Sequence, residues 1–185
     1  MKPDKRQILT VPNLLSLLRL LMIPLFVWLY LHGYEGWTAA VLILSGVTDV
    51  VDGFIARHFG QVSDFGKALD PVADKLTQAV MLLCLMSNHP MMIVPFILLA
   101  VKEAFAAVSG MIVIKRTGYV PGAEWHGKVT TMLLYGMMII HVVWQDIPGW
   151  MSNVLNGGCV VMMLLSLVLY ARRNIRAIRS AEKSA

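Results

Sequence analysis

Six long apolar stretches run through this chain, and each has a length that suits a helix crossing a lipid bilayer. A spanning helix needs about 20 mostly apolar residues. The stretches are Leu14–Leu31, Thr38–Arg57, Asp70–Met86, Met92–Ile114, Val129–Trp144 and Met151–Tyr170. Hydrophobic residues make up 57% of the 185 residues and charged residues only 15%, which excludes an ordinary water-soluble enzyme. We therefore predict an all-α, polytopic membrane protein with six transmembrane helices.

The distribution of Lys and Arg predicts how these helices are oriented. Of the 16 basic residues, 14 lie in or next to the N-terminal arm, two joints and the tail, whereas the joints near residues 32–37, 87–91 and 145–150 contain none. Basic residues are enriched in cytoplasmic loops, so both termini are expected in the cytoplasm. A net charge of +5 also occurs in proteins that bind nucleic acid, but this layout of the charges argues against such a partner.

The whole chain, residues 1–185, is expected to form one membrane domain. Residues 1–13 form a cytoplasmic arm with a short interfacial helix, residues 14–171 the six-helix bundle, and residues 172–185 a basic cytoplasmic tail that contacts anionic lipid. Two cations fall within apolar stretches. Arg19 lies close enough to the interface to snorkel, whereas Lys102 lies too deep to do so.

Four aspartates occupy positions where an apolar helix normally carries no charge. Asp49 and Asp52 lie toward the end of the second stretch, and Asp70 and Asp74 lie at the start of the third. A charged side chain at the centre of a membrane costs ~2.5–3.5 kcal/mol even on the lenient insertion scale, so such residues are usually functional. Residues three or four apart share a helix face. Because the connection between the two helices is short, we expect them to be antiparallel, with both carboxylate pairs converging near the cytoplasmic boundary.

Clustered carboxylate oxygens suit hard divalent cations such as Mg²⁺ or Mn²⁺. Two such ions about 3.5–4 Å apart would form a site for displacement at phosphorus. The residues alone leave two other interpretations open: interfacial salt bridges with Arg57, Lys67 and Lys75, or the ion or proton relay of a small transporter. Gly53 and Ala56 leave one helix face open to a ligand or to close helix packing.

Residues 49–74 resemble a known signature. They read Asp49-x2-Asp52-Gly53-x2-Ala56-Arg57-x8-Gly66-x3-Asp70-x3-Asp74. This pattern is similar, at every fixed position, to the signature of the CDP-alcohol phosphatidyltransferase family. The expected six-span layout with both termini inside also resembles that family, so the resemblance covers essentially the whole chain.

The resemblance implies an enzyme that transfers a phosphatidyl group from CDP-diacylglycerol to the hydroxyl of an alcohol, with release of CMP. It implies two divalent cations held by Asp49, Asp52 and Asp70, and a catalytic base at Asp74, which also lies close to a metal. The residues implied in donor binding are Asp49, Asp52, Gly53, Ala56, Arg57 and Gly66. The resemblance further implies a homodimer in a bacterial plasma membrane, with the active site facing the cytoplasm.

Other segments bear on the acceptor alcohol. Pro12–Arg19 and Leu69–Lys75 resemble both the phosphatidylglycerophosphate synthases and the cardiolipin synthases of this family, whereas Trp125–Thr131 resembles the former group. Two positions depart from that group, which has Lys at Thr130 and an Arg-Glu pair at Lys102-Glu103. We expect glycerol 3-phosphate as the acceptor, with phosphatidylglycerol, giving cardiolipin, as the alternative.

A phosphorylated acceptor needs cationic partners. The candidates are Lys102, Lys115, Arg116 and Lys128. Simpler interpretations remain for three of them: Lys102 and Glu103 would form an intramembrane ion pair, and Lys115 and Arg116 would only set the topology.

Overall fold

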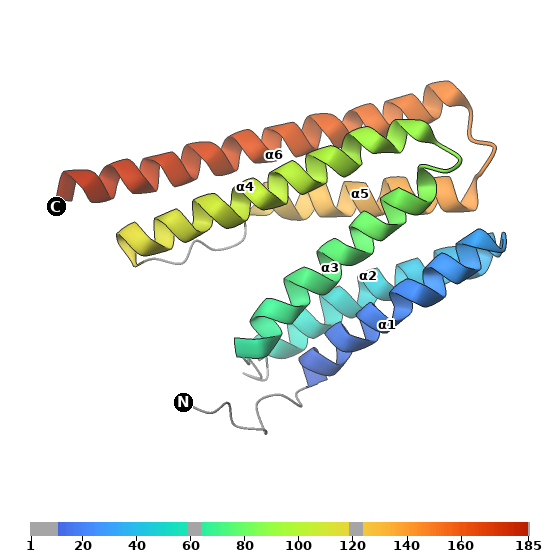
Figure 1. The fold of residues 1–185 in the computed structure, drawn as a ribbon, viewed down its shortest axis with the longest axis horizontal. Helices are drawn as coiled ribbons and strands as arrows, with labels where there is room; N and C mark the ends of the chain where they lie inside the picture. Colours follow the sequence, from blue (N-terminus) through green and yellow to red (C-terminus); the bar gives the residue numbers. More distant parts are fainter. Residues whose placement is uncertain (1–10, 59–63, 119–123, 185) are drawn as a thin grey trace. The chain divides into compact units, whose positions relative to one another are not determined.

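The computed structural model is all-helical over the residues that it describes, which are 11–58, 64–118 and 124–184 (Figure 1). Its helices are α1 (Val11–Leu31), α2 (Glu35–His58), α3 (Asp64–Leu85), α4 (Ile93–Thr117), α5 (Trp125–Val143) and α6 (Gly149–Ser184), and a short 3-10 helix, η2 (Pro90–Met92), precedes α4. Each apolar stretch of the sequence falls on one of the helices α1 to α6, to within one residue at its ends. The number and order of the six helices predicted from these stretches are confirmed.

Three of the described helices are long and apolar enough to cross a membrane. The segments are Asn13–Leu31, Pro90–Thr117 and Gly149–Ser180, each with a mean hydropathy of 2.1. The polar residues of the aspartate motif lie on α2 and α3 instead. The structure thus supports a helical protein with three candidate spans, while the six-span topology with cytoplasmic termini stays a prediction.

Glycines close two of the helices. Gly33 follows α1 with φ +74°, and Gly118 follows α4 with φ +66°. This left-handed backbone costs glycine little and other residues much more. The amide of Gly118 donates to the carbonyl oxygen of Ile114 at 2.9 Å, which satisfies one of the last carbonyls of α4. Both glycines lie in the joints that the sequence predicts.

The chain divides into two compact units. The first consists of Met1–Asn88 and Met138–Asp146, and the second of His89–Met137 and Ile147–Ala185. In the first unit, α1 packs against both α2 and α3; in the second, α4 packs against α6.

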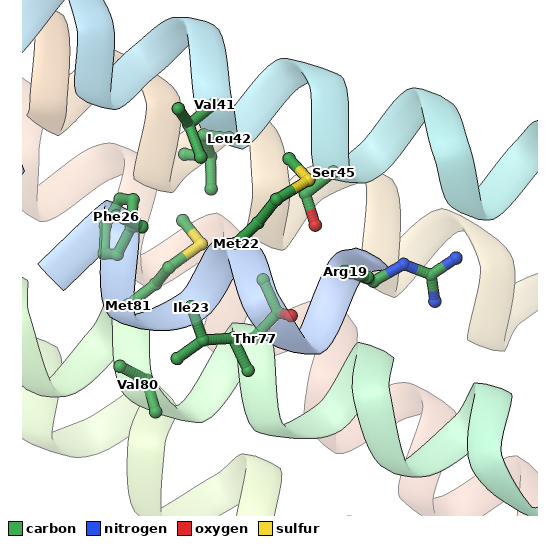
Figure 2. A pocket seen from close by; sticks show the side chains of 10 residues that line it. All are labelled: Arg19, Met22, Ile23, Phe26, Val41, Leu42, Ser45, Thr77, Val80 and Met81. Atoms are coloured by element: carbon green, nitrogen blue, oxygen red, sulfur yellow. The ribbon is translucent and has the colours of Figure 1, made fainter. Parts of the chain in front are cut away.

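A small cavity in the first unit shows how its three helices run. Figure 2 places Phe26, Leu42 and Met81 at one end of it and Arg19, Ser45 and Thr77 at the other. From the first end of the cavity to the second, the residue numbers decrease along α1 and α3 and increase along α2. This confirms that α2 and α3 are antiparallel.

The basic segment expected as a separate tail continues α6 without a break as far as Ser184. At 1.5 Å per residue, the 36 residues of α6 span about 54 Å, against about 30 Å for the hydrocarbon core of a bilayer. At the other terminus, the expected interfacial helix falls largely on residues 1–10, which lie outside the described residues, and α1 begins at Val11.

Candidate active site

The whole aspartate motif lies on two helices. Asp49, Asp52, Gly53, Ala56 and Arg57 lie in the last three turns of α2, and Gly66, Asp70 and Asp74 lie in the first half of α3. For the five residues on α2 and for Gly66, the structure describes the backbone alone. The expected convergence of the two carboxylate pairs and the expected donor contacts therefore stay predictions, whereas the surroundings of Asp70 and Asp74 are described.

Asp70 is paired with an arginine from the first helix. Arg19 Nη1 donates to Asp70 Oδ1 at 3.0 Å, and Ser16 Oγ, one turn earlier on α1, donates to the same oxygen at 3.4 Å. The side chain of Arg19 is 0% exposed, whereas that of Asp70 is 40% exposed. The guanidinium group of Arg19 thus has a partner on α3 whose own side chain is partly exposed, and the expected snorkelling of Arg19 to the interface stays a prediction. The carboxylate of Asp70 stays accessible to a further ligand.

Both carboxylate oxygens of Asp74, which lies one turn later on α3, have polar partners. Gln78 Nε2 donates to Oδ1 at 2.9 Å, and Lys75 Nζ lies 3.0 Å from Oδ2. Gln78 is fully buried and Asp74 nearly so, while the Lys75 side chain is 29% exposed. The salt-bridge interpretation is thus confirmed for Lys75, and the contact occurs within α3.

The two described carboxylates fit part of a divalent-cation site. They lie one turn apart on the same helix face and offer the oxygen atoms that Mg²⁺ and Mn²⁺ prefer. Within residues 11–58, 64–118 and 124–184, the described side chains include no group of three His, Cys, Asp or Glu residues able to hold an ion. Asp70 and Asp74 therefore need further ligands, and the other aspartates of the motif are the candidates that the sequence offers.

The four candidate residues for binding the acceptor phosphate belong to the second unit, and they differ in their exposure to solvent. Lys102 is buried within α4 and paired with Glu103 Oε1, as the ion-pair interpretation predicts. Lys115 and Arg116 are exposed in the last turn of α4, and Lys128 is exposed in the first turn of α5. Lys102 and Lys115 are thirteen residues apart in one helix, about 20 Å along its axis, so a single phosphate cannot contact both.

A polar cluster between α5 and α6 was not predicted from the sequence. It consists of Glu124, His126, Ser166, Tyr170 and Arg173. The Nδ1 of His126 lies 2.9 Å from Ser166 Oγ, and the His126 ring meets the Tyr170 ring edge-on at 4.6 Å. The guanidinium of Arg173 lies 5.0 Å from the centre of the Tyr170 ring and donates to Glu124 Oε1 at 2.9 Å. Ser166 and Tyr170 are four residues apart on α6, which is the local signal that points to a shared polar face.

Burial lowers the pKa of His126, which precedes the apolar part of α5. The positive charges of Arg173 and Lys102 lower the pKa further, and Glu124 raises it. His126 therefore favours its neutral form more strongly than an exposed histidine does.

The sequence profile of the CDP-alcohol phosphatidyltransferases matches residues 9–174. The chain belongs to the CDP-alcohol phosphatidyltransferase family. The match extends over most of the chain and includes every residue of the aspartate motif. This phosphatidyltransferase is accordingly a membrane-associated enzyme of phospholipid biosynthesis, in a family that generally depends on divalent cations.

The relatives of this phosphatidyltransferase include proteins named as cardiolipin synthases and proteins named as glycerol-3-phosphate phosphatidyltransferases. A cardiolipin synthase (CMP-forming) of Streptomyces coelicolor is 35% identical over 155 residues, covering 80% of this chain and 71% of that protein. A CDP-diacylglycerol–glycerol-3-phosphate 3-phosphatidyltransferase of Aquifex aeolicus is 30% identical over 176 residues, covering 92% and 98%. A putative cardiolipin synthase of Mycobacterium tuberculosis is 48% identical over 73 residues, and the chain spans about a third (35%) of its length.

Proposed function

We propose that this phosphatidyltransferase transfers the phosphatidyl group of CDP-diacylglycerol to glycerol 3-phosphate, forming phosphatidylglycerophosphate and releasing CMP. The observation that carries the reaction is the placement of Asp70 and Asp74 one turn apart on α3, each with its carboxylate held by defined partners. The near full-length match to the A. aeolicus enzyme supports glycerol 3-phosphate as the acceptor.

In the proposed reaction, the acceptor hydroxyl oxygen forms a bond to the lipid-linked phosphorus, and the bond from this phosphorus to the oxygen of CMP breaks. Asp74 receives the hydroxyl proton. Two divalent cations, Mg²⁺ or Mn²⁺, held by Asp49, Asp52, Asp70 and Asp74, would neutralise the donor diphosphate. Gln78 keeps the Asp74 carboxylate in place, and the partly exposed Lys75 gives way as the acceptor approaches.

The remaining motif residues are assigned to the donor. We propose that Gly53, Ala56, Arg57 and Gly66 bind the CDP group together with Asp49 and Asp52, as the resemblance of the motif implies. Small residues allow a ligand close to the backbone, and an arginine matches the charge and planar geometry of phosphate oxygens.

We assign the acceptor phosphate to the candidate cations Lys102, Lys115, Arg116 and Lys128. Among the four candidates, Lys102 is buried, and its positive charge helps to lower the pKa of His126. Solvent screens the attraction between a phosphate and a buried cation less than that between a phosphate and an exposed cation. Lys128 is a second candidate contact, and the exposed Lys115 and Arg116 would attract anionic substrate toward this end of α4.

The setting in the cell is also proposed. Six helices would cross a bacterial plasma membrane, with both termini and the active site on the cytoplasmic side, and the protein would act as a homodimer. The three joints without any Lys or Arg support this orientation.

A second candidate acceptor is phosphatidylglycerol, which would give cardiolipin. The observation in its favour is the S. coelicolor cardiolipin synthase, at 35% identity over 80% of this chain. The reaction steps are the same for both acceptors, so the acceptor itself has to be tested.

The deciding experiment measures CMP release by the purified protein in detergent, with CDP-diacylglycerol and either Mg²⁺ or Mn²⁺. Glycerol 3-phosphate and phosphatidylglycerol are offered separately. We expect cation-dependent release with glycerol 3-phosphate, and release with phosphatidylglycerol alone would replace the first candidate by the second. Asp74→Asn should be inactive, while Asp146→Asn, at an exposed aspartate between α5 and α6, should be active. Folded protein that releases no CMP with either acceptor would contradict the proposal.

A further inference from the structure

Arg19 is an unusual residue for an apolar helix such as α1. Its aliphatic stem lines the cavity between α1, α2 and α3, whereas its guanidinium group points away from that cavity (Figure 2). The side chain is fully buried, and its partner Asp70 keeps 40% of its side-chain surface exposed. A buried cation therefore meets an accessible carboxylate at the edge of the first unit.

Stability alone is a poor explanation for this arrangement. Burying an ion pair costs so much solvation that well-packed apolar residues often serve as well or better. Moreover, Ser16 and Arg19 are three residues apart on α1 and donate to the same atom, Asp70 Oδ1. Two donors on one oxygen restrict the rotation of the carboxylate, in addition to balancing its charge.

We propose that Arg19 is a positioning residue for Asp70: it fixes the orientation in which this carboxylate is offered to a divalent cation, and Ser16 assists it. The inference rests on the proposed role of Asp70 as a metal ligand. Carboxylate ligands are commonly oriented by hydrogen bonds from a second layer of residues, and loss of such a partner typically lowers metal affinity or activity by 10–100-fold.

A positioning role and a purely electrostatic role of Arg19 predict opposite changes in metal affinity when Arg19 is replaced. A fixed positive charge repels a cation, so removal of the Arg19 charge alone would strengthen metal binding. Loss of positioning would weaken it. The direction of the change in affinity therefore separates the two roles, and it is measured without any substrate turnover.

The test measures Mn²⁺ binding to the full-length protein in detergent by titration calorimetry, checked by electron paramagnetic resonance. We expect Arg19→Gln to weaken binding by about 10–100-fold, and Arg19→Lys and Ser16→Ala to weaken it by less. The control is Ser45→Ala, a buried serine at the same cavity, which should bind Mn²⁺ as the parent protein does. Unchanged or tighter binding by folded Arg19→Gln would overturn the proposal.

Two further variants test the positioning role even if Arg19→Gln does not fold. If Arg19→Gln does not fold, the double variant Arg19→Lys with Ser16→Ala decides: weaker Mn²⁺ binding supports the proposal, and parental binding overturns it. Asp70→Asn distinguishes the proposed role of Asp70 as a metal ligand from the proposed positioning role of Arg19. Parental Mn²⁺ binding by Asp70→Asn would remove Asp70 from the metal site and so contradict the proposed function. Weaker binding by Asp70→Asn but not by the Arg19 variants would overturn the positioning role alone.

Discussion

The hydroxyl oxygen of Tyr170 lies directly against the backbone of Gly127, 2.7 Å from the position that a Cβ atom would take there. Two residues contact the Tyr170 ring, because the His126 ring meets it edge-on and the Arg173 guanidinium lies over it. The tyrosine cannot move away without disturbing these contacts. A side chain at position 127 would therefore displace Tyr170, so the close approach of α5 and α6 at this point favours glycine.

A methyl group at this position should destabilise the protein. We expect Gly127→Ala to lower the free energy of unfolding by about 1–3 kcal/mol, the usual cost of overpacking a filled site. Thermal melting in detergent measures the effect. Gly136→Ala is the control, because this glycine also lies in α5 and has nothing within 4 Å of its Cβ position. Adding Tyr170→Phe to Gly127→Ala should restore much of the loss, and equal melting temperatures for both glycine variants would contradict the prediction.

Gln78 should control the activity of Asp74. Its amide donates to Asp74 Oδ1 from a fully buried position, so Gln78→Leu leaves the carboxylate less well oriented. Because misplacement of a catalytic group by about 1 Å can cost 100-fold, we expect CMP release to fall by roughly 10–100-fold. The control is Thr77→Val, because the Thr77 hydroxyl donates to the carbonyl oxygen of Ala73 in its own helix. An equal loss of activity in both variants would indicate general disruption of α3.

Lys102 should affect the acceptor more than the donor. A hydrogen bond to a charged group contributes about 1.5–3 kcal/mol, so Lys102→Met should lower kcat/KM for glycerol 3-phosphate by roughly 10–150-fold. Steady-state kinetics with each substrate varied in turn measures this effect. Lys115→Met, an exposed lysine in the same helix, should change kcat/KM much less, especially at high salt. A loss that appears equally in the KM of CDP-diacylglycerol would argue against an acceptor role for Lys102.

His126 should make the stability depend on pH. Its pKa is lowered by burial, so below its ordinary value of about 6.5 the unfolded chain takes up a proton that the folded protein does not. Stability from this group is thus complete above about pH 6.5 and falls as the pH decreases toward the folded-state pKa. Melting temperatures measured from pH 7.5 to pH 5 should decrease less in His126→Gln than in the parent protein. The same slope in both proteins would show that other groups cause the pH dependence.

The helices and their ends were predictable because the signals are local. Apolar stretches of about 20 residues and the glycines at 33 and 118 determine where α1 and α4 run and end, and neither signal depends on distant parts of the chain. The continuation of α6 beyond Tyr170 was not predicted, because hydropathy marks where an apolar stretch ends and not where a helix ends. Arg and Ala, each of which occurs four times after Tyr170, favour helix whether or not the segment around them is apolar.

The contacts of the candidate site were less predictable. The motif gave the positions of Asp70 and Asp74, but their partners follow from packing. Arg19 precedes Asp70 by 51 residues, and Glu124 precedes Arg173 by 49, so no local pattern links either pair. A signal for the first pair was present nevertheless. Ser16 and Arg19, three residues apart, place two polar side chains on one face of an apolar helix, which predicts a polar partner facing them.

The distance along the chain between Arg19 and Asp70 has a consequence for biogenesis. During synthesis, α1 leaves the ribosome before α3 exists, so Arg19 enters the membrane without the carboxylate that accompanies it in the finished protein. Arg19 lies six residues from the start of its candidate span, about 9 Å along the helix, within reach of the lipid head groups. The contact between Arg19 and Asp70 can form only after α3 has been synthesised. The ion pair therefore joins an early segment of the chain to one that is made 51 residues later.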